Sequence, residues 1–269
     1  MASLSDTTDR VIAAGRASFA ASLLAFGIQQ LIYTGFIKGL ELVPEWIPGH
    51  TFWAYFTGVA LIAAGVSIPI NKMSRLAAGL TVVIFIVCIL LLHGPRISAI
   101  VHDGSERTRA FETLAMCSGA LFLFGILPFE PGLRTWNRAS KIAIQLGRFF
   151  LAISLAIFGL NHFLFARFIA TLIPGWIPWH LFWAYFTGAV FVAGAIGTAF
   201  QYRVCMAGVL VGAMLFLWVA VLHAPRVAAH LRNGDEWNSA FVALGISGVA
   251  FLATGARKGP SEPFEGKRT

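Results

Sequence analysis

The sequence predicts an all-α polytopic membrane protein with eight transmembrane helices, arranged as two parallel four-helix repeats. Apolar residue types make up 58% of the chain and charged types only 12%, about half the charged share of a soluble domain. Eight long apolar segments follow one another, and the first half of the sequence recurs in the second half. Because such a chain has too little polar surface to cover a water-soluble globule, we expect it to lie in a lipid bilayer.

The apolar segments have the length of membrane-spanning helices. They run over Ile12–Tyr33, Phe52–Ile70, Leu76–Leu92, Ala110–Phe129, Ile142–Phe165, Phe182–Phe200, Cys205–Leu222 and Ala240–Gly255. A helix needs about 20 residues to cross a bilayer, whereas a barrel strand needs about 10 in an alternating pattern. The apolar runs are continuous, so each is predicted to be a helix. The last run is the shortest, and we expect its helix to extend beyond one of these bounds.

The chain is a tandem repeat. Leu42–Gly58 matches Leu172–Gly188 at 13 of 17 positions, at an offset of 130 residues, and Leu92–Arg96 matches Leu222–Arg226 at the same offset. Four crossings per repeat place both copies in one orientation, so we expect a pseudo-twofold axis along the membrane normal. We divide the chain into a first four-helix unit (1–130), a cytoplasmic linker (131–141), a second four-helix unit (142–256) and a polar cytoplasmic tail (257–269).

The basic residues predict the orientation. The side with both termini carries 13 of the 20 Lys and Arg residues, and the opposite, outer side carries 7. The positive-inside rule therefore places both termini in the cytoplasm. The net charge of +8 comes from residues scattered between apolar runs and not from one basic face. We therefore expect the lipid bilayer as a partner and not nucleic acid.

All seven histidines are predicted to lie on the outer side, and two of them begin a repeated motif. His93-Gly-Pro-Arg96 and His223-Ala-Pro-Arg226 each follow the third helix of a repeat. A proline disfavours helix at the residue before it, so each helix is expected to end there. One interpretation is an interface cap, in which His and Arg meet free carbonyls and lipid phosphates. The other is a donor site for an anion or a carbonyl-bearing lipophile.

A second motif precedes the second helix of each repeat. It contains His50, Trp53 and Tyr55 in the first copy, and His180, Trp183 and Tyr185 in the second. The first and fourth residues of a helix share one face, so His50 and Trp53 can act together. We expect His50 to approach His93 and Arg96, and their copies to do the same. The motif suits a head-group pocket, or alternatively an aromatic belt that anchors the helix.

Further polar groups end the first helix of each repeat. These are Gln29 and Gln30 in one copy and Asn161 and His162 in the other. They either line the same pocket or hydrogen-bond a neighbouring helix. The three cysteines show no metal-ligand spacing, and no metal site is predicted.

The four-helix unit resembles the DoxX-like family of small bacterial membrane proteins. The resemblance rests on Gly15-Arg16, the Ile47-Pro48 turn, Trp53–Gly58, Ala63–Gly65 and Leu92–Arg96, and the second copy repeats the set. It implies a location in the bacterial inner membrane and an association with quinone-linked redox systems. Typical members carry one unit, so this chain resembles a fused dimer.

Two functions follow as hypotheses. The chain is a membrane subunit of a quinone-linked oxidoreductase, with the histidines and arginines bonded to the quinone carbonyls and the aromatic residues against its ring. Alternatively, it is a non-catalytic binder of a lipophile, or a scaffold for a partner protein. A carrier is a third hypothesis, because parallel repeats are common in transporters. No encoded cofactor is recognised, so the first hypothesis takes a bound quinone or lipid, and electrons from a redox partner protein or membrane complex. The sequence leaves open whether the chain is an enzyme.

Overall fold

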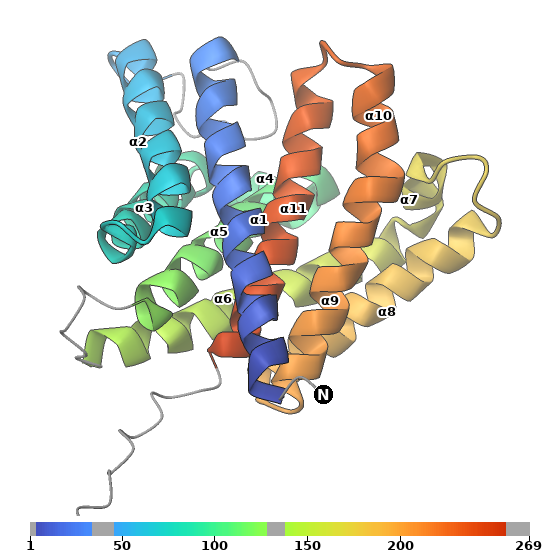
Figure 1. The fold of residues 1–269 in the computed structure, drawn as a ribbon. Coiled ribbons are helices and arrows are strands. Elements are labelled where there is room, and N and C mark those ends of the chain that lie inside the picture. The colour runs from blue at the N-terminus through green and yellow to red at the C-terminus, as the bar shows by residue number, and fades with distance from the viewer. Residues whose placement is uncertain (1–3, 34–45, 128–137, 257–269) are drawn as a thin grey trace, which may run out of the picture.

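The computed structural model describes residues 4–33, 46–127 and 138–256, which form helices without strands (Figure 1). Among these residues, eight helices are long and apolar enough to cross a membrane, which confirms the predicted all-α membrane fold with eight crossings. The spans are formed by α1 (Leu4–Tyr33), α2 (His50–Ile70), α3 (Ser74–Cys88), α5 (Gly104–Ile126), α6 (Arg138–Leu164), α8 (His180–Ala199), α9 (Val204–Trp218) and α11 (Gly234–Gly255). The spans that begin with α3 and α9 continue through the helical turns that follow them, to His93 and Ala229. The last span extends ahead of Ala240, as its short apolar run predicts.

One boundary of the predicted linker lies inside a helix. Helix α6 begins at Arg138, so residues 138–141 of the predicted linker are helical. Arg138 and Lys141 are exposed there, and a helix can extend past its apolar run because long basic side chains reach the polar interface. Residues 131–137 of the linker and the tail 257–269 lie outside the described residues.

The third helix of each repeat ends in a π-helical turn. These turns are η1 (Ile89–His93) and η2 (Val219–His223), 130 residues apart. After η1 the chain turns before α4 (Ile97–His102), so the helix ends ahead of Pro95 as predicted. After η2 it continues directly into α10 (Ala224–Ala229), and the prediction that Pro225 ends the helix is wrong. Pro225 lies in the first turn of α10, where the missing N–H of proline costs nothing.

The helices pack across the two repeats. Helix α1 lies against α2 of its own repeat and α11 of the other, and α6 lies against α8 of its own repeat and α5 of the other. The same glycines mediate these contacts in both copies: a Cβ atom at Gly15 would lie 2.8 Å from the carbonyl oxygen of Gly248, and one at Gly147 would lie 3.1 Å from that of Ser118. The helix pairs therefore correspond one for one, while superposition of the halves about a pseudo-twofold axis stays a prediction.

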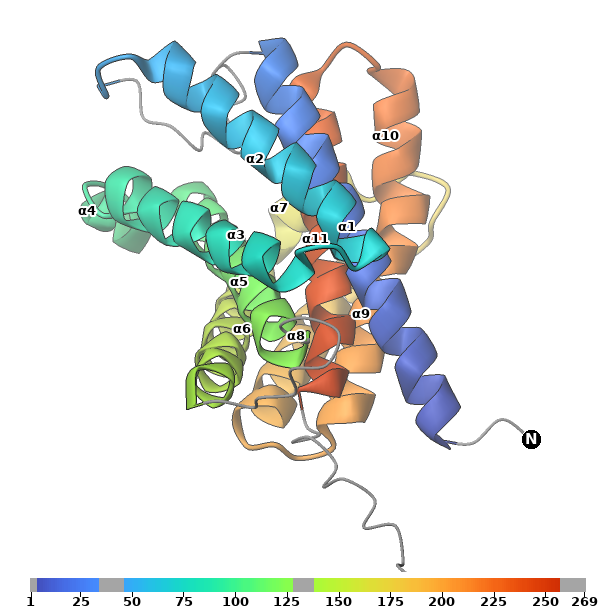
Figure 2. The ribbon, with the colours of Figure 1, turned by 60° about the vertical axis from the view of Figure 1, so that its left-hand side comes forward.

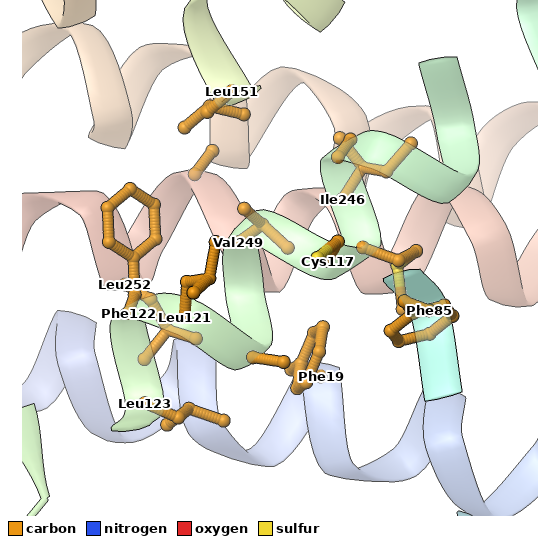
Figure 3. Packing of buried hydrophobic residues seen from close by; sticks show 14 of the residues in the cluster. Phe19, Phe85, Cys117, Leu121, Phe122, Leu123, Leu151, Ile246, Val249 and Leu252 are labelled. Carbon is orange, nitrogen blue, oxygen red and sulfur yellow. The ribbon is translucent and has the colours of Figure 1, made fainter. Parts of the chain in front are cut away.

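The core lies around α5 and α11. These are the two most buried of the eight spans, so the remaining spans surround them. Figure 3 shows the packing there: Phe19 and Phe85 lie beside side chains of α5 and α11. On the periphery, α2 and α3 diverge from the turn that joins them (Figure 2). That turn has left-handed backbone at Asn71 and Met73, as does its copy at Gln201 and Arg203.

Candidate functional site

The π-helical turns place a histidine at the same position of each repeat. In η1, the amide N–H of Gly94 donates to the carbonyl oxygen of Ile89, five residues earlier, at 3.0 Å. A π turn adds one residue to the helical turn and is frequent at functional sites. His93 and His223 are the last residues of their π turns.

His93 is held inside the protein. Its ring is only 5% exposed, and Nε2 lies 3.1 Å from Oγ1 of Thr113 on α5. The Thr113 hydroxyl lies 3.0 Å from the carbonyl oxygen of Arg109 and donates to it. No hydrogen-bond partner for Nδ1 of His93 is present among the described residues. A buried polar atom without a partner costs free energy, so this nitrogen is a candidate ligand contact.

A charged group formed by Arg96, ahead of α4, and by Glu106 and Arg109 at the start of α5 lies near His93. Glu106 accepts a hydrogen bond from Nη1 of Arg109 at 2.9 Å and lies 3.7 Å from Nη1 of Arg96. These three residues lie close enough to His93 to act on its ring electrostatically. The Arg96 side chain is 48% exposed and that of Glu106 18%. The two arginines and one carboxylate give this group a net positive charge.

In the second repeat, the corresponding arginine and glutamate make different contacts. Nε and Nη2 of Arg226 donate to the two carboxylate oxygens of Glu236 at 2.9 and 2.8 Å. This is a bidentate pair, in which two N–H groups of the planar guanidinium bond to the two oxygens of one carboxylate. Nδ1 of His223 also has no partner within the described part of the chain, but the counterpart of Thr113 is Ala243, which has no hydroxyl. The two ends are thus related by sequence but not equivalent in chemistry.

The carboxylates were not among the predicted site residues. Glu106 and Glu236 are 130 residues apart, and this shared offset with the arginines is the signal that could have identified them. Arg109 and Thr113 are replaced by Ser239 and Ala243 in the second repeat, so no repeat signal points to them.

The predicted aromatic residues lie at the beginnings of α2 and α8. Trp53 and Tyr55 are 43% and 45% exposed, and the Trp53 ring packs edge-on against Phe56 of its own helix, 5.9 Å away. Trp183 is more enclosed: its indole N–H donates to the carbonyl oxygen of Pro178 at 3.1 Å, and its ring lies 6.1 Å from Trp218 on α9. Tyr185 stacks on Phe163 at 5.9 Å.

His50 and His180 are the first residues of α2 and α8 and are partly exposed. The approach of His50 to His93 and Arg96, and of His180 to His223 and Arg226, stays a prediction. His93 and Arg96 are joined by their backbone, because the amide N–H of Arg96 donates to the carbonyl oxygen of His93 at 3.1 Å.

The polar residues near the ends of α1 and α6 differ in their hydrogen bonding. Oδ1 of Asn161 accepts from Nε of Arg107, and Nδ2 donates to Oγ1 of Thr108, both at 2.9 Å. This residue therefore joins α6 to α5. His162 donates through Nδ1 to the carbonyl oxygen of Phe158 at 2.8 Å. Gln29 and Gln30 are buried, and no partner for Oε1 of either is present among the described residues.

No three His, Cys, Asp or Glu side chains gather as metal ligands within the described part of the chain. No family model, curated protein or solved structure matches the chain. The resemblance to the DoxX-like family therefore stays a prediction from the sequence.

Proposed function

We propose that this integral membrane protein binds the head group of a quinone-like lipophile at the end of its first repeat. The observation that carries the proposal is the ring of His93, which is 5% exposed with an unpartnered nitrogen beside the positively charged group of Arg96, Glu106 and Arg109. Quinone head groups are flat, apolar rings with polar oxygens, and such ligands need a few placed polar groups in an apolar surround.

In this proposal the protein is a membrane subunit of a quinone-linked oxidoreductase in a bacterial inner membrane. A redox partner protein supplies electrons, and the chain holds the quinone near the outer surface. The basic-residue count and the DoxX-like sequence features support the location and orientation. The exposed aromatic side chains of Trp53 and Tyr55 provide a surface against which the ring or its tail can pack.

The test is quinone binding by the purified full-length protein in lipid nanodiscs, measured by quenching of tryptophan fluorescence. Hydrogen bonds to charged groups are worth about 1.5–3 kcal/mol, which is about 10- to 150-fold in affinity. Arg96→Ala should therefore weaken binding by such a factor, and Arg96→Lys should recover part of it because an ammonium lacks the planar fork. His223→Ala, in the second repeat, is the matched control for His93→Ala and should leave binding unchanged.

A scaffold without ligand binding is the second candidate, and the Arg226–Glu236 pair favours it. The Arg226 guanidinium already bonds to both carboxylate oxygens of Glu236. In this candidate function the pair has a structural role, because it links α10 to α11. If Arg96→Ala lowers thermal stability and leaves quinone binding and co-purified lipids unchanged, Arg96 has a structural role as well, and the binding proposal fails.

A further inference from the structure

The hydrogen bonds around His93 determine which of its ring nitrogens carries the proton. The carbonyl oxygen of Arg109 can only accept, so the Thr113 hydroxyl hydrogen must point toward it across their 3.0 Å separation. The Thr113 oxygen therefore accepts from Nε2–H of His93 at 3.1 Å. A neutral imidazole has one N–H, so Nδ1 of neutral His93 is an acceptor. This nitrogen is also buried, and none of the residues that the structure describes donates to it.

A second acceptor without a donor belongs to the same group. Oε1 of Glu106 accepts from Arg109 at 2.9 Å, whereas the buried Oε2 has no hydrogen-bond partner among the described residues. Its separation of 3.7 Å from Arg96 Nη1 is too long for a hydrogen bond. The Glu106 charge also acts on the ring of His93. The site thus offers two acceptors, and a carbonyl oxygen cannot satisfy either of them.

We propose that the first repeat selects a head group that donates a hydrogen bond, namely a hydroxyl-bearing aromatic ring such as a hydroquinone, over the corresponding quinone. This inference rests on the proposed function and specifies its ligand. The hydroxyl donates to Nδ1 of His93, which fills the missing bond. A quinone carbonyl at the same place would face a lone pair, and the buried acceptor would stay unpaired.

The second repeat shows which residue creates this selectivity. Ala243 replaces Thr113, so no hydroxyl at that position fixes the proton of His223. Both carboxylate oxygens of Glu236 are bonded to Arg226, so the second acceptor is also lost. The selective site is therefore expected in the first repeat alone.

The experiment compares three probes on the full-length protein in nanodiscs under anaerobic conditions: an alkyl hydroquinone, its dimethyl ether and the matching quinone. We expect the hydroquinone to bind about tenfold more tightly than either of the others. Thr113→Val keeps the shape of the side chain but frees the His93 proton to move to Nδ1, so the preference should fall to about twofold or less. Thr113→Ser keeps the hydroxyl and should retain the preference.

The outcomes separate the two proposals. Equal or tighter binding of the quinone by the unaltered protein overturns the selectivity and leaves the proposed function standing. An equal preference in the valine and serine variants also overturns it, because the threonine would then not fix the proton. Absence of binding for all three probes overturns the proposed function itself. The wild-type comparison decides the selectivity even if a Thr113 variant does not fold.

Discussion

The two arginine–glutamate pairs are expected to differ in the coupling free energy between their partners, and this difference can be measured. In the second repeat, Arg226 and Glu236 form two hydrogen bonds of 2.9 and 2.8 Å, with side chains 35% and 13% exposed. In the first repeat, Arg96 lies 3.7 Å from Glu106, its side chain is 48% exposed, and Arg109 already bonds to the same carboxylate. The two pairs occupy equivalent sequence positions, so one serves as the control for the other.

The geometry sets the expected energies. Exposed ion pairs contribute about 0.2–1 kcal/mol, and hydrogen bonds to charged groups about 1.5–3 kcal/mol. For the mostly covered, two-pronged Arg226–Glu236 pair we expect a coupling free energy of about 1.5 kcal/mol, the lower end of the second range. For the long Arg96–Glu106 contact we expect less than about 0.5 kcal/mol.

Double-mutant cycles measure these couplings. The variants are Arg226→Gln, Glu236→Gln and their combination, together with Arg96→Gln, Glu106→Gln and theirs. The free energy of unfolding is measured in mixed micelles by titration with SDS. A cycle is needed because removing one partner also leaves the other charge unpaired. A coupling between Arg96 and Glu106 as large as that between Arg226 and Glu236 would refute the reasoning.

Three further predictions follow from the packing and the charges. Gly27→Ala should destabilise the protein by about 1–3 kcal/mol, because its Cβ would lie 2.5 Å from the Gly58 carbonyl oxygen; Gly175→Ala, which meets nothing within 4 Å, should be neutral in the same SDS titration. Arg75→Met should lower the free energy of unfolding by about 2 kcal/mol, since Arg75 is 4% exposed and donates to Ser140 at 2.7 Å and to the Leu127 carbonyl oxygen at 3.3 Å. As a control, Arg10→Met, at an exposed position, should change the free energy of unfolding little. A reporter fused after Thr269 should register in the cytoplasm, and an external signal would contradict the orientation derived from the basic residues.

The sequence by itself determined the number of crossings and the two copies of the motif. Whether a run of about 20 residues enters a bilayer depends on its own hydrophobicity, which is a local property. The same locality fixes His93 and His223 at the ends of helices. Where local rules failed, at Pro225, the reason was that a proline is disfavoured inside a helix but acceptable in the first turn of a new one.

Only the tertiary structure decided which helices are neighbours and which side chains meet. The packing of α1 on α11 and of α6 on α5 depends on close approach at glycines such as Gly15 and Gly248, which are far apart in the sequence. Helices in lipid associate through such packing and not through a hydrophobic force between them, so apolar pattern carries little information about partners. For the same reason the sequence identified Arg96 and Arg226 as site residues but not Glu106 and Glu236. These carboxylates lie on α5 and α11 and come near the arginines only when the helices pack.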